Sequence, residues 1–153
     1  MATFTIDVCG SADCGKSAFI LKFITGEFLK DRKCSLASGT RTFLTNGGYI
    51  TVNCNDGISE NADARIVMFD KHKGLQNELC QIDQMLTTNK PKVLCGNKKD
   101  KKGCIKEDSF IRNIMNEYSV EYYHISGLSG YNLEKPVLCL LRILTNKPDL
   151  YFM

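Results

Sequence analysis

The sequence predicts an α/β protein of one domain, residues 1–153, with a mostly parallel central sheet and helices on both faces in three layers. Short β-rich runs alternate with helical patterns along the whole chain, which is typical of a parallel sheet covered on both sides. A glycine-containing loop joins the first strand to the first helix. The chain also has an ordinary length for one domain with its own core.

Six short runs have the composition of strands, and the first of them carries Asp7, an awkward residue for a buried position. The segment TNGG, Thr45 to Gly48, places Asn-Gly between two apolar alternations, which is the strongest short hairpin signal. We therefore expect an antiparallel pair around it and buried strands elsewhere. The expected strands are residues 4–9, 41–45, 49–54, 65–70, 92–97 and 121–126.

Helical patterns lie between these strands, with apolar residues three or four positions apart. The first ends at Gly26, since glycine commonly terminates helices. The last carries Pro136 in its first turn, where proline is tolerated. The expected helices are residues 16–26, 74–88, 107–118 and 132–145.

Composition excludes several classes of partner. The net charge of +3 is too small to argue for nucleic acid or a charged membrane surface. The eight cysteines show no CxxC spacing, so we expect reduced thiols in an intracellular protein rather than a zinc site. We expect no signal peptide, no membrane span and no lipid anchor.

The segment GSADCGKS, residues 10–17, matches the phosphate-loop pattern GxxxxGK[ST] and stands between a strand and a helix, as the mechanism requires. Backbone N–H groups at the start of the helix favour bound phosphate. The lysine reaches the terminal phosphates, and the serine hydroxyl can bind Mg²⁺. The expected nucleotide-binding residues here are Gly10, Asp13, Cys14, Gly15, Lys16, Ser17 and Ala18.

The segment NKKD, residues 97–100, indicates the base. A carboxylate at Asp100 can accept hydrogen bonds from the ring N–H and the exocyclic amine of guanine. Adenine lacks that pair of donors, so an unpaired carboxylate discriminates by roughly 10⁴ or more. Asn97 and Lys98 complete the expected base-binding segment, and the predicted ligand is GTP or GDP.

These motifs resemble those of small GTPases of the Ras superfamily, and most closely the Ran subfamily. The resemblance extends nearly end to end and is most specific in TGEF (25–28), IVMFD (66–70), VLCGNKKD (93–100) and YNLEKP (131–136). It implies the P-loop fold of small GTPases. The ending TNKPDLYFM resembles the stretch after the last helix of Ran, without the acidic extension that follows there.

The resemblance also implies further ligand contacts. Phe28 would pack on the guanine ring, and the backbone N–H groups of Ser126 and Gly127 would meet the guanine carbonyl oxygen. Leu128 stands where the family has a lysine, which weakens that third contact. Mg²⁺ would be held by Ser17 and Ser35, and through water by Asp56.

The catalytic segment departs from the family pattern. Glu60 replaces the glutamine that orients the attacking water, and Ser59 replaces the glycine that meets the γ-phosphate. Eight residues, 57–64, separate Asp56 from Arg65, which leaves no room for an ordinary helix there. Ala12 crowds the space that the glutamine and an arginine finger need, and such a finger is worth up to about 10⁵ in rate.

The resulting hypothesis is a Ran-like guanine-nucleotide-binding protein whose GTP hydrolysis is weak or lost. The resemblance implies nuclear transport receptors or regulators of Ran as partners, and a place in the nucleus and cytoplasm, of a host cell for a viral or parasitic source. One alternative is a slow but genuine GTPase. A second is an interaction module that competes with Ran whatever the nucleotide. A nucleotide kinase is disfavoured because no arginine-bearing lid is visible.

Overall fold

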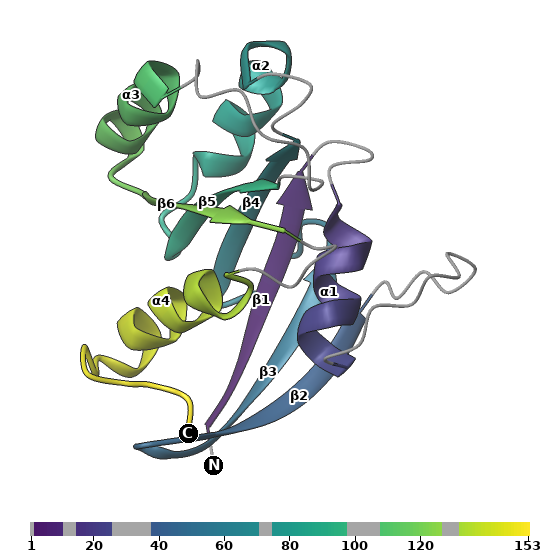
Figure 1. Cartoon of the computed structure of the whole chain (residues 1–153), viewed down its shortest axis with the longest axis vertical. Helices are drawn as coiled ribbons and strands as arrows, with labels where there is room; N and C mark the ends of the chain where they lie inside the picture. The colour runs from purple at the N-terminus through teal and green to yellow at the C-terminus, as the bar shows by residue number, and fades with distance from the viewer. Residues whose placement is uncertain (1, 11–14, 26–37, 71–74, 98–107, 127–131) are drawn as a thin grey trace.

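The computed structural model of the chain describes residues 2–10, 15–25, 38–70, 75–97, 108–126 and 132–153 (Figure 1). The strands are β1 (Ala2–Gly10), β2 (Ser38–Thr45), β3 (Gly48–Asp56), β4 (Ala64–Asp70), β5 (Lys92–Asn97) and β6 (Glu121–Ile125). The helices are α1 (Lys16–Thr25), α2 (Leu75–Leu86), α3 (Asp108–Tyr118) and α4 (Glu134–Thr145). The expected strands and helices are thus confirmed, with boundaries that differ by a few residues.

The six strands form one sheet in the order β2-β3-β1-β4-β5-β6. Strand β1 is parallel to both β3 and β4, and β5 is parallel to both β4 and β6. Strand β2 runs antiparallel to β3 at one edge. The Asn46-Gly47 turn reverses the chain there, with Gly48 at φ +104° and the Thr45 hydroxyl donating to the Gly48 carbonyl oxygen at 2.6 Å.

The predicted fold class, a three-layer P-loop fold of the small-GTPase kind with a mostly parallel sheet, was wrong. The described residues form a mixed sheet of six strands with four helices. The sheet is mixed because the hairpin at residues 45–48 commits β2 to an antiparallel edge position. This is a general α/β architecture, and it does not by itself identify a P-loop fold.

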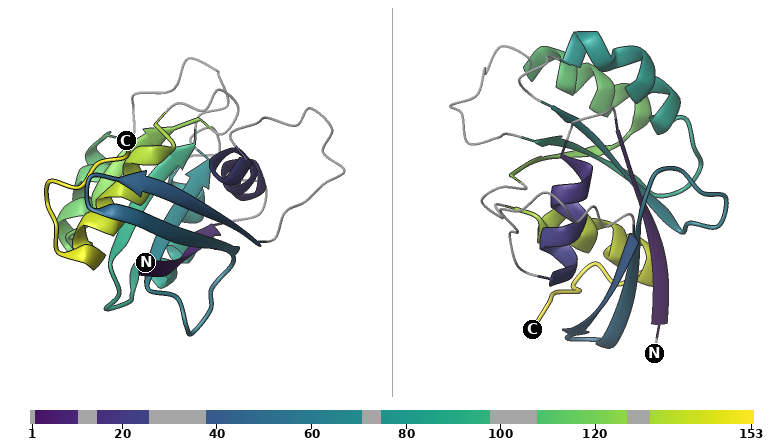
Figure 2. Two further views of the ribbon diagram at one scale, coloured as in Figure 1. Left: turned by 90° about the horizontal axis from the view of Figure 1, so that it is seen from below. Right: turned by 90° about the vertical axis from the view of Figure 1, so that its right-hand side faces the viewer.

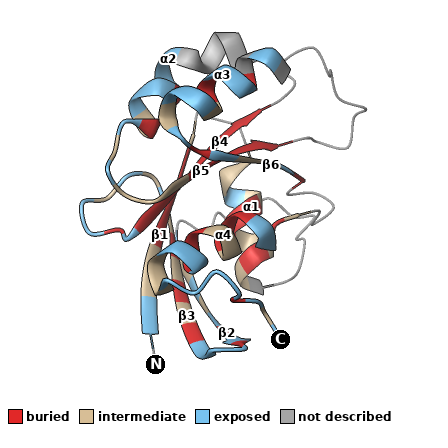
Figure 3. Ribbon diagram, turned by 90° about the vertical axis from the view of Figure 1, so that its left-hand side faces the viewer, coloured by how far each residue is buried: buried red, intermediate tan, exposed pale blue. Residues whose placement is uncertain are grey.

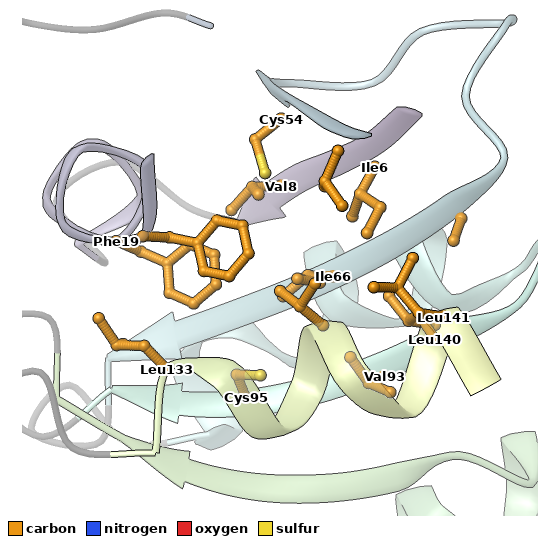
Figure 4. Close-up of a cluster of buried hydrophobic side chains, with 14 of the residues drawn as sticks. Ile6, Val8, Phe19, Cys54, Ile66, Val93, Cys95, Leu133, Leu140 and Leu141 are labelled. Atoms are coloured by element: carbon orange, nitrogen blue, oxygen red, sulfur yellow. The ribbon is translucent and has the colours of Figure 1, made fainter. Parts of the chain in front are cut away.

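Alternate residues of the central strands enter two separate apolar clusters. Ile66 and Met68 of β4 belong to the cluster that α1 and α4 cover, whereas Val67 and Phe69 belong to the cluster that α2 and α3 cover. Figure 4 shows side chains of the first cluster converging between α1, α4 and the sheet. The right-hand view of Figure 2 shows the two helix pairs on separate sides of the strands. Figure 3 shows that β4 and β5 are buried.

An aromatic row joins α1 to the end of the chain. The ring centroids of Phe23 and Phe43 lie 5.0 Å apart, and those of Phe43 and Phe152 lie 4.5 Å apart. Phe152 forms an isolated antiparallel bridge with Thr45 of β2. Aromatic pairs of this kind contribute about 0.5–1.5 kcal/mol each beyond the area they bury. The last residues are therefore anchored on the edge strand.

Cysteines in the sheet behave as small apolar side chains. Cys9, Cys54 and Cys95 are buried, and none of these three forms a disulfide. Burial raises the pKa of the Cys54 thiol to about 12, so it stays protonated at neutral pH. Among the described helices, none is both long enough and apolar enough to cross a membrane.

Replacing Leu140 by alanine tests the cluster beneath α4. Leu140 is fully buried, so Leu140→Ala should lower the free energy of unfolding by about 2–5 kcal/mol through lost burial and a residual cavity. Ile143 on the same helix is 55% exposed, and Ile143→Ala should change it by no more than about 0.5 kcal/mol. Guanidinium denaturation measures both. Equal losses for the two variants would contradict this assignment of the helix faces.

Candidate functional site

The carboxyl ends of five strands meet at one edge of the sheet. The register pairs Val8 with Asp56, Gly10 with Met68, Asp70 with Asn97, and Asn97 with Ile125. Ligands of open α/β sheets bind outside the carboxyl ends of the strands. The polar residues at or just beyond these ends are Asp56, Asp70, Asn97 and Ser126. We call this set, together with Gly10 and Lys16, the carboxyl-edge site.

Gly15 joins the two halves of the predicted nucleotide site. It has φ +95°, a conformation that L side chains rarely adopt. A Cβ atom built on Gly15 would overlap Nδ2 of Asn97 and lie 3.2 Å from its Cγ. The side chain that opens the predicted base-binding segment therefore packs directly on the backbone of the predicted phosphate loop. Only glycine leaves room for that contact.

Lys16 brings a positive charge to the site from the first residue of α1. Its Nζ donates to the carbonyl oxygen of Gly10 at 2.9 Å and lies 3.7 Å from Oδ1 of Asp56. Both side chains are partly open to solvent, so the ion pair itself contributes at most about 1 kcal/mol. The contact with Gly10 instead directs the lysine side chain toward the end of β1. Because the Lys16 side chain is partly exposed, an anionic ligand could reach its ammonium group and replace Asp56 as its partner.

The first turn of α1 adds backbone donors. The Phe19 N–H donates to the Gly15 carbonyl oxygen at 3.0 Å, which starts the helix directly after the loop. The N–H groups that precede it have no carbonyl within the helix to bind. Ser17 is exposed and Ala18 is half-buried in this turn. The helix dipole places partial positive charge at this end, next to Lys16.

Asn97, at the end of β5, and Ser126, one residue past β6, lie at neighbouring positions of the sheet. Asn97 is the last residue of β5 and is in register with Ile125, the last residue of β6. Both polar side chains are buried. The predicted guanine contacts from Asn97 and from the backbone of Ser126 therefore start from adjacent positions at the edge. This adjacency follows from parallel pairing of β5 with β6.

Several predicted contacts lie outside the described residues. The phosphate-loop residues among them are Ala12, Asp13 and Cys14. The base-binding, metal-binding and neighbouring residues are Phe28, Ser35, Lys98, Asp100, Gly127 and Leu128. Of the predicted metal ligands, Ser17 and Asp56 are described. Within the described ranges, no group of three or more His, Cys, Asp or Glu side chains could hold a metal ion.

The segment after Asp56 leaves the carboxyl edge at once. The Gly57 N–H donates to the Val8 carbonyl oxygen at 2.9 Å, and the Ser59 N–H donates to Oδ2 of Asp7 at 2.7 Å. The Glu60 carbonyl oxygen accepts from Nζ of Lys90 at 3.0 Å. Because Lys90 precedes the start of β5, Glu60 lies toward the opposite edge. The structure does not bring Glu60 together with Lys16.

Two charged residues in the core, Asp7 and Arg65, are buried and had no role in the predicted site. They are in register on β1 and β4, and both lie on the face that α2 and α3 cover. Arg65 donates from Nη1 to the Met85 carbonyl oxygen at 2.6 Å, at the end of α2. The signal in the sequence was a charged residue within each apolar run, because charged side chains are rarely buried unless they are paired. Buried Asp70 had no predicted role either.

A second cation meets the same helix end. Nζ of Lys92 donates to the carbonyl oxygens of Leu86 at 2.6 Å and of Thr88 at 3.0 Å. Desolvation lowers the pKa of Lys92, and the neighbouring Arg65 charge lowers it further. The helix dipole favours cations at this terminus. Arg65 and Lys92 therefore fix the end of α2 and have a structural role away from the carboxyl-edge site.

Replacing Gly15 by alanine should destabilise the protein more than the same change at Gly48. Both residues have positive φ, but a Cβ on Gly48 meets nothing within 4 Å. Gly48→Ala should therefore cost only the backbone strain, about 1–2 kcal/mol. Gly15→Ala adds overlap with Asn97 and should cost at least about 1 kcal/mol more. Thermal unfolding of both variants measures the difference, and equal losses would contradict the Gly15–Asn97 contact.

The site is thus an edge where a helix N-terminus, a lysine and a buried asparagine converge. A helix N-terminus and a lysine are groups that bind anions in proteins. No protein-family model matches the sequence.

Proposed function

We propose that this protein binds a guanine nucleotide at the carboxyl-edge site and hydrolyses GTP weakly or not at all. Phosphates would lie against Gly10, Gly15, Lys16 and the first turn of α1. The base would lie against Asn97, Asp100 and the backbone at Ser126. Mg²⁺ would neutralise the phosphates, held by Ser17 and, through water, by Asp56. Mg²⁺ commonly takes few protein ligands in such sites and keeps several waters.

The observation that carries this proposal is the contact between Gly15 and Asn97. The phosphate-loop pattern and the NKKD pattern are about eighty residues apart in the chain, and NKKD alone is a weak signal. The Asn97 side chain packs where a Gly15 Cβ would stand. A single ligand with phosphates and a base can therefore touch both segments. Lys16 in the same place supplies the charge that phosphate requires.

Weak hydrolysis is supported by the position of the segment that follows Asp56. Positioning the attacking water and stabilising the leaving charge supply most of the rate in phosphoryl transfer. The Ser59 N–H is bound to the Asp7 carboxylate instead of facing the edge. The Glu60 carbonyl oxygen is bound to Lys90. Neither residue is placed to orient water beside Lys16.

The partners follow from the proposed ligand and from the resemblance to the Ran subfamily. A protein that holds a nucleotide without cutting it acts through its surface. We propose nuclear transport receptors or regulators of Ran as the partner class, and the nucleus and cytoplasm as the place of action. A pull-down of transport receptors with purified protein tests this part, with the Asp100→Ala variant as comparison.

Two substitutions test nucleotide binding. Asp100→Ala should weaken GDP binding by at least about 100-fold, because the guanine donors lose a charged acceptor. Lys16→Ala should weaken it by a similar factor through lost phosphate contact. Lys22→Ala, in the last turn of the same helix, should leave affinity within about threefold, since a partly exposed charge at that distance is screened by salt. Fluorescent GDP titration with Mg²⁺ gives the constants. Unchanged affinity in Asp100→Ala would contradict guanine recognition.

Replacing Glu60 by glutamine, the residue that small GTPases have at this place, should not restore GTP hydrolysis. Glu60→Gln supplies the amide that orients water in active relatives, but the Glu60 backbone lies against Lys90. Single-turnover release of phosphate from GTP should therefore change by less than about twofold. Glu134→Gln, at the start of α4, serves as the matched control. A rise of about tenfold or more in Glu60→Gln alone would show that this residue reaches the reaction centre.

A further inference from the structure

The β2–β3 hairpin has a helix over only one of its two faces. Alternate side chains of the hairpin, among them Phe43, Ile50 and Val52, enter the cluster that α1 and α4 cover. The other side chains face the opposite way, and residues 57–63, which follow β3, form no helix that could lie over them. In the right-hand view of Figure 2, α2 and α3 lie at the opposite end of the molecule from the hairpin turn. We call this set the hairpin face: Ser38, Thr40, Thr42, Leu44, Tyr49, Thr51, Asn53 and Asn55.

The hairpin face carries no charged side chain. Five of its residues are exposed and the other three are half-buried. Charged residues make up 24% of the chain and are mostly found on protein surfaces, so a solvated face of this size is expected to hold some. Arg41, the charged residue within β2, is directed to the other face, where it donates to the Phe23 carbonyl oxygen at 2.7 Å. The hairpin thus keeps its cation away from this face.

Polar side chains of the hairpin face are ordered by bonds to one another. The Thr40 hydroxyl donates to Oδ1 of Asn53 at 2.7 Å, and the hydroxyl oxygens of Thr42 and Thr51 lie 2.9 Å apart. Both pairs join residues that are directly opposite on β2 and β3. Side chains that are already ordered lose less conformational entropy when a partner binds. The middle of the face is therefore prepared for contact.

Large apolar side chains gather at the turn end of the hairpin face. Leu44 and Tyr49 are directly opposite each other and are 42% and 59% exposed. The Met153 N–H donates to the Leu44 carbonyl oxygen, which brings the end of the chain beside them. Tyr151 and Met153 are 52% and 74% exposed. Exposed apolar groups that adjoin one another mark interaction sites, and tyrosine and methionine are enriched at protein interfaces.

We propose that the hairpin face is the contact surface between two copies of this chain related by a two-fold axis. Such an interface sets one patch against the same patch, so a patch of one charge sign would repel itself. The hairpin face avoids that repulsion because it has no charge. Its hydroxyl and amide groups both donate and accept hydrogen bonds, so they can bond to their own copies. Nucleic acids and anionic membranes require cations, which this face lacks.

The dimer should be weak and concentration-dependent. A standard interface uses about 20–30 residues on each side, and the hairpin face with the adjoining tail is smaller. We therefore expect a dissociation constant on the order of 10–100 μM. Sedimentation velocity across about 5–500 μM protein measures it, and a monomer over that whole range would overturn the proposal.

Charge placed on the hairpin face should break the dimer. Thr42→Lys, in the middle of the face, should raise the dissociation constant at least about tenfold through like-charge repulsion. Gln84→Lys, exposed on α2, adds the same charge elsewhere and should leave the constant within about twofold. If Thr42→Lys does not fold, Tyr49→Lys applies the same test at a more exposed position. Equal constants for the face variant and the Gln84→Lys variant would overturn the proposal.

Mixing opposite charges tests self-contact directly. Thr42→Lys and Thr42→Glu should each be monomeric at about 100 μM, and an equimolar mixture should form heterodimers because attraction replaces repulsion across the interface. A mixture that associates no more than either variant alone would contradict contact of this face with its own copy. None of these measurements uses a nucleotide, so their outcome is independent of the proposed function.

Amide hydrogen exchange separates contact through the face from pairing along the edge of β2. The Met153 N–H binds the Leu44 carbonyl oxygen, so the backbone groups of Thr42 and Thr40, two and four residues earlier, also point to the outer edge. In the proposed dimer these two amides should exchange at the same rate at low and high protein concentration, while the methyl signals of Thr42, Thr51 and Leu44 shift. Protection of the Thr40 and Thr42 amides that rises with concentration would show edge pairing and overturn the proposal.

Discussion

Strand β4 must be buried on both faces, and the rest of the structure follows from that requirement. All seven of its residues are buried, and alternate ones enter the two apolar clusters. It therefore needs a helix pair on each side and a strand at each edge, which β1 and β5 provide. Because β3 lies on the far side of β1, the chain must pass over β1 to begin β4. Residues 57–63, which connect β3 to β4, make this crossing, and the Asp7 carboxylate binds them through Ser59.

Under the proposed function, the residues that would hold the ligand lie apart from the segment that would sense its terminal phosphate. Gly15, Lys16 and Asn97 are positioned by the start of α1 and by the ends of β1 and β5. The segment that would sense a terminal phosphate in a nucleotide switch is instead part of the sheet's own hydrogen bonding. Under the proposed function, a ligand would bind without moving the segment after Asp56, and regulation would come from the concentration of the ligand or from partners.

The sequence predicted the elements well because their signals are local. Alternation of apolar residues, the Asn46-Gly47 turn and the helical spacing each depend on neighbours in the chain. The fold class was wrong because it depends on how strands pair across long distances, and the hairpin signal for an antiparallel edge was not carried into that description. For the site, the motifs located the glycine loop and Asn97. Their direct contact was not predictable, since it depends on the register of β4 with β5.

The two buried charges illustrate the same limit. Asp7 was noted as out of place in a strand, yet nothing local names Ser59 as its partner, 52 residues away. Arg65 lies in a run that otherwise reads as apolar, and its acceptor is a carbonyl oxygen at the end of α2. Such residues can be flagged from the sequence as anomalies. Their roles require the three-dimensional arrangement.

The last residues of the chain also bear on how the protein behaves at high concentration. The Met153 N–H donates to the Leu44 carbonyl oxygen at 2.9 Å, and the Tyr151 carbonyl oxygen accepts the Asn46 N–H at 3.2 Å. These bonds occupy one end of β2, which is otherwise an outer strand with backbone groups available for pairing. Unprotected outer strands recruit other chains and promote aggregation. Residues 151–153 thereby cover one end of this outer strand, and a fusion after Met153 would have to preserve their pairing.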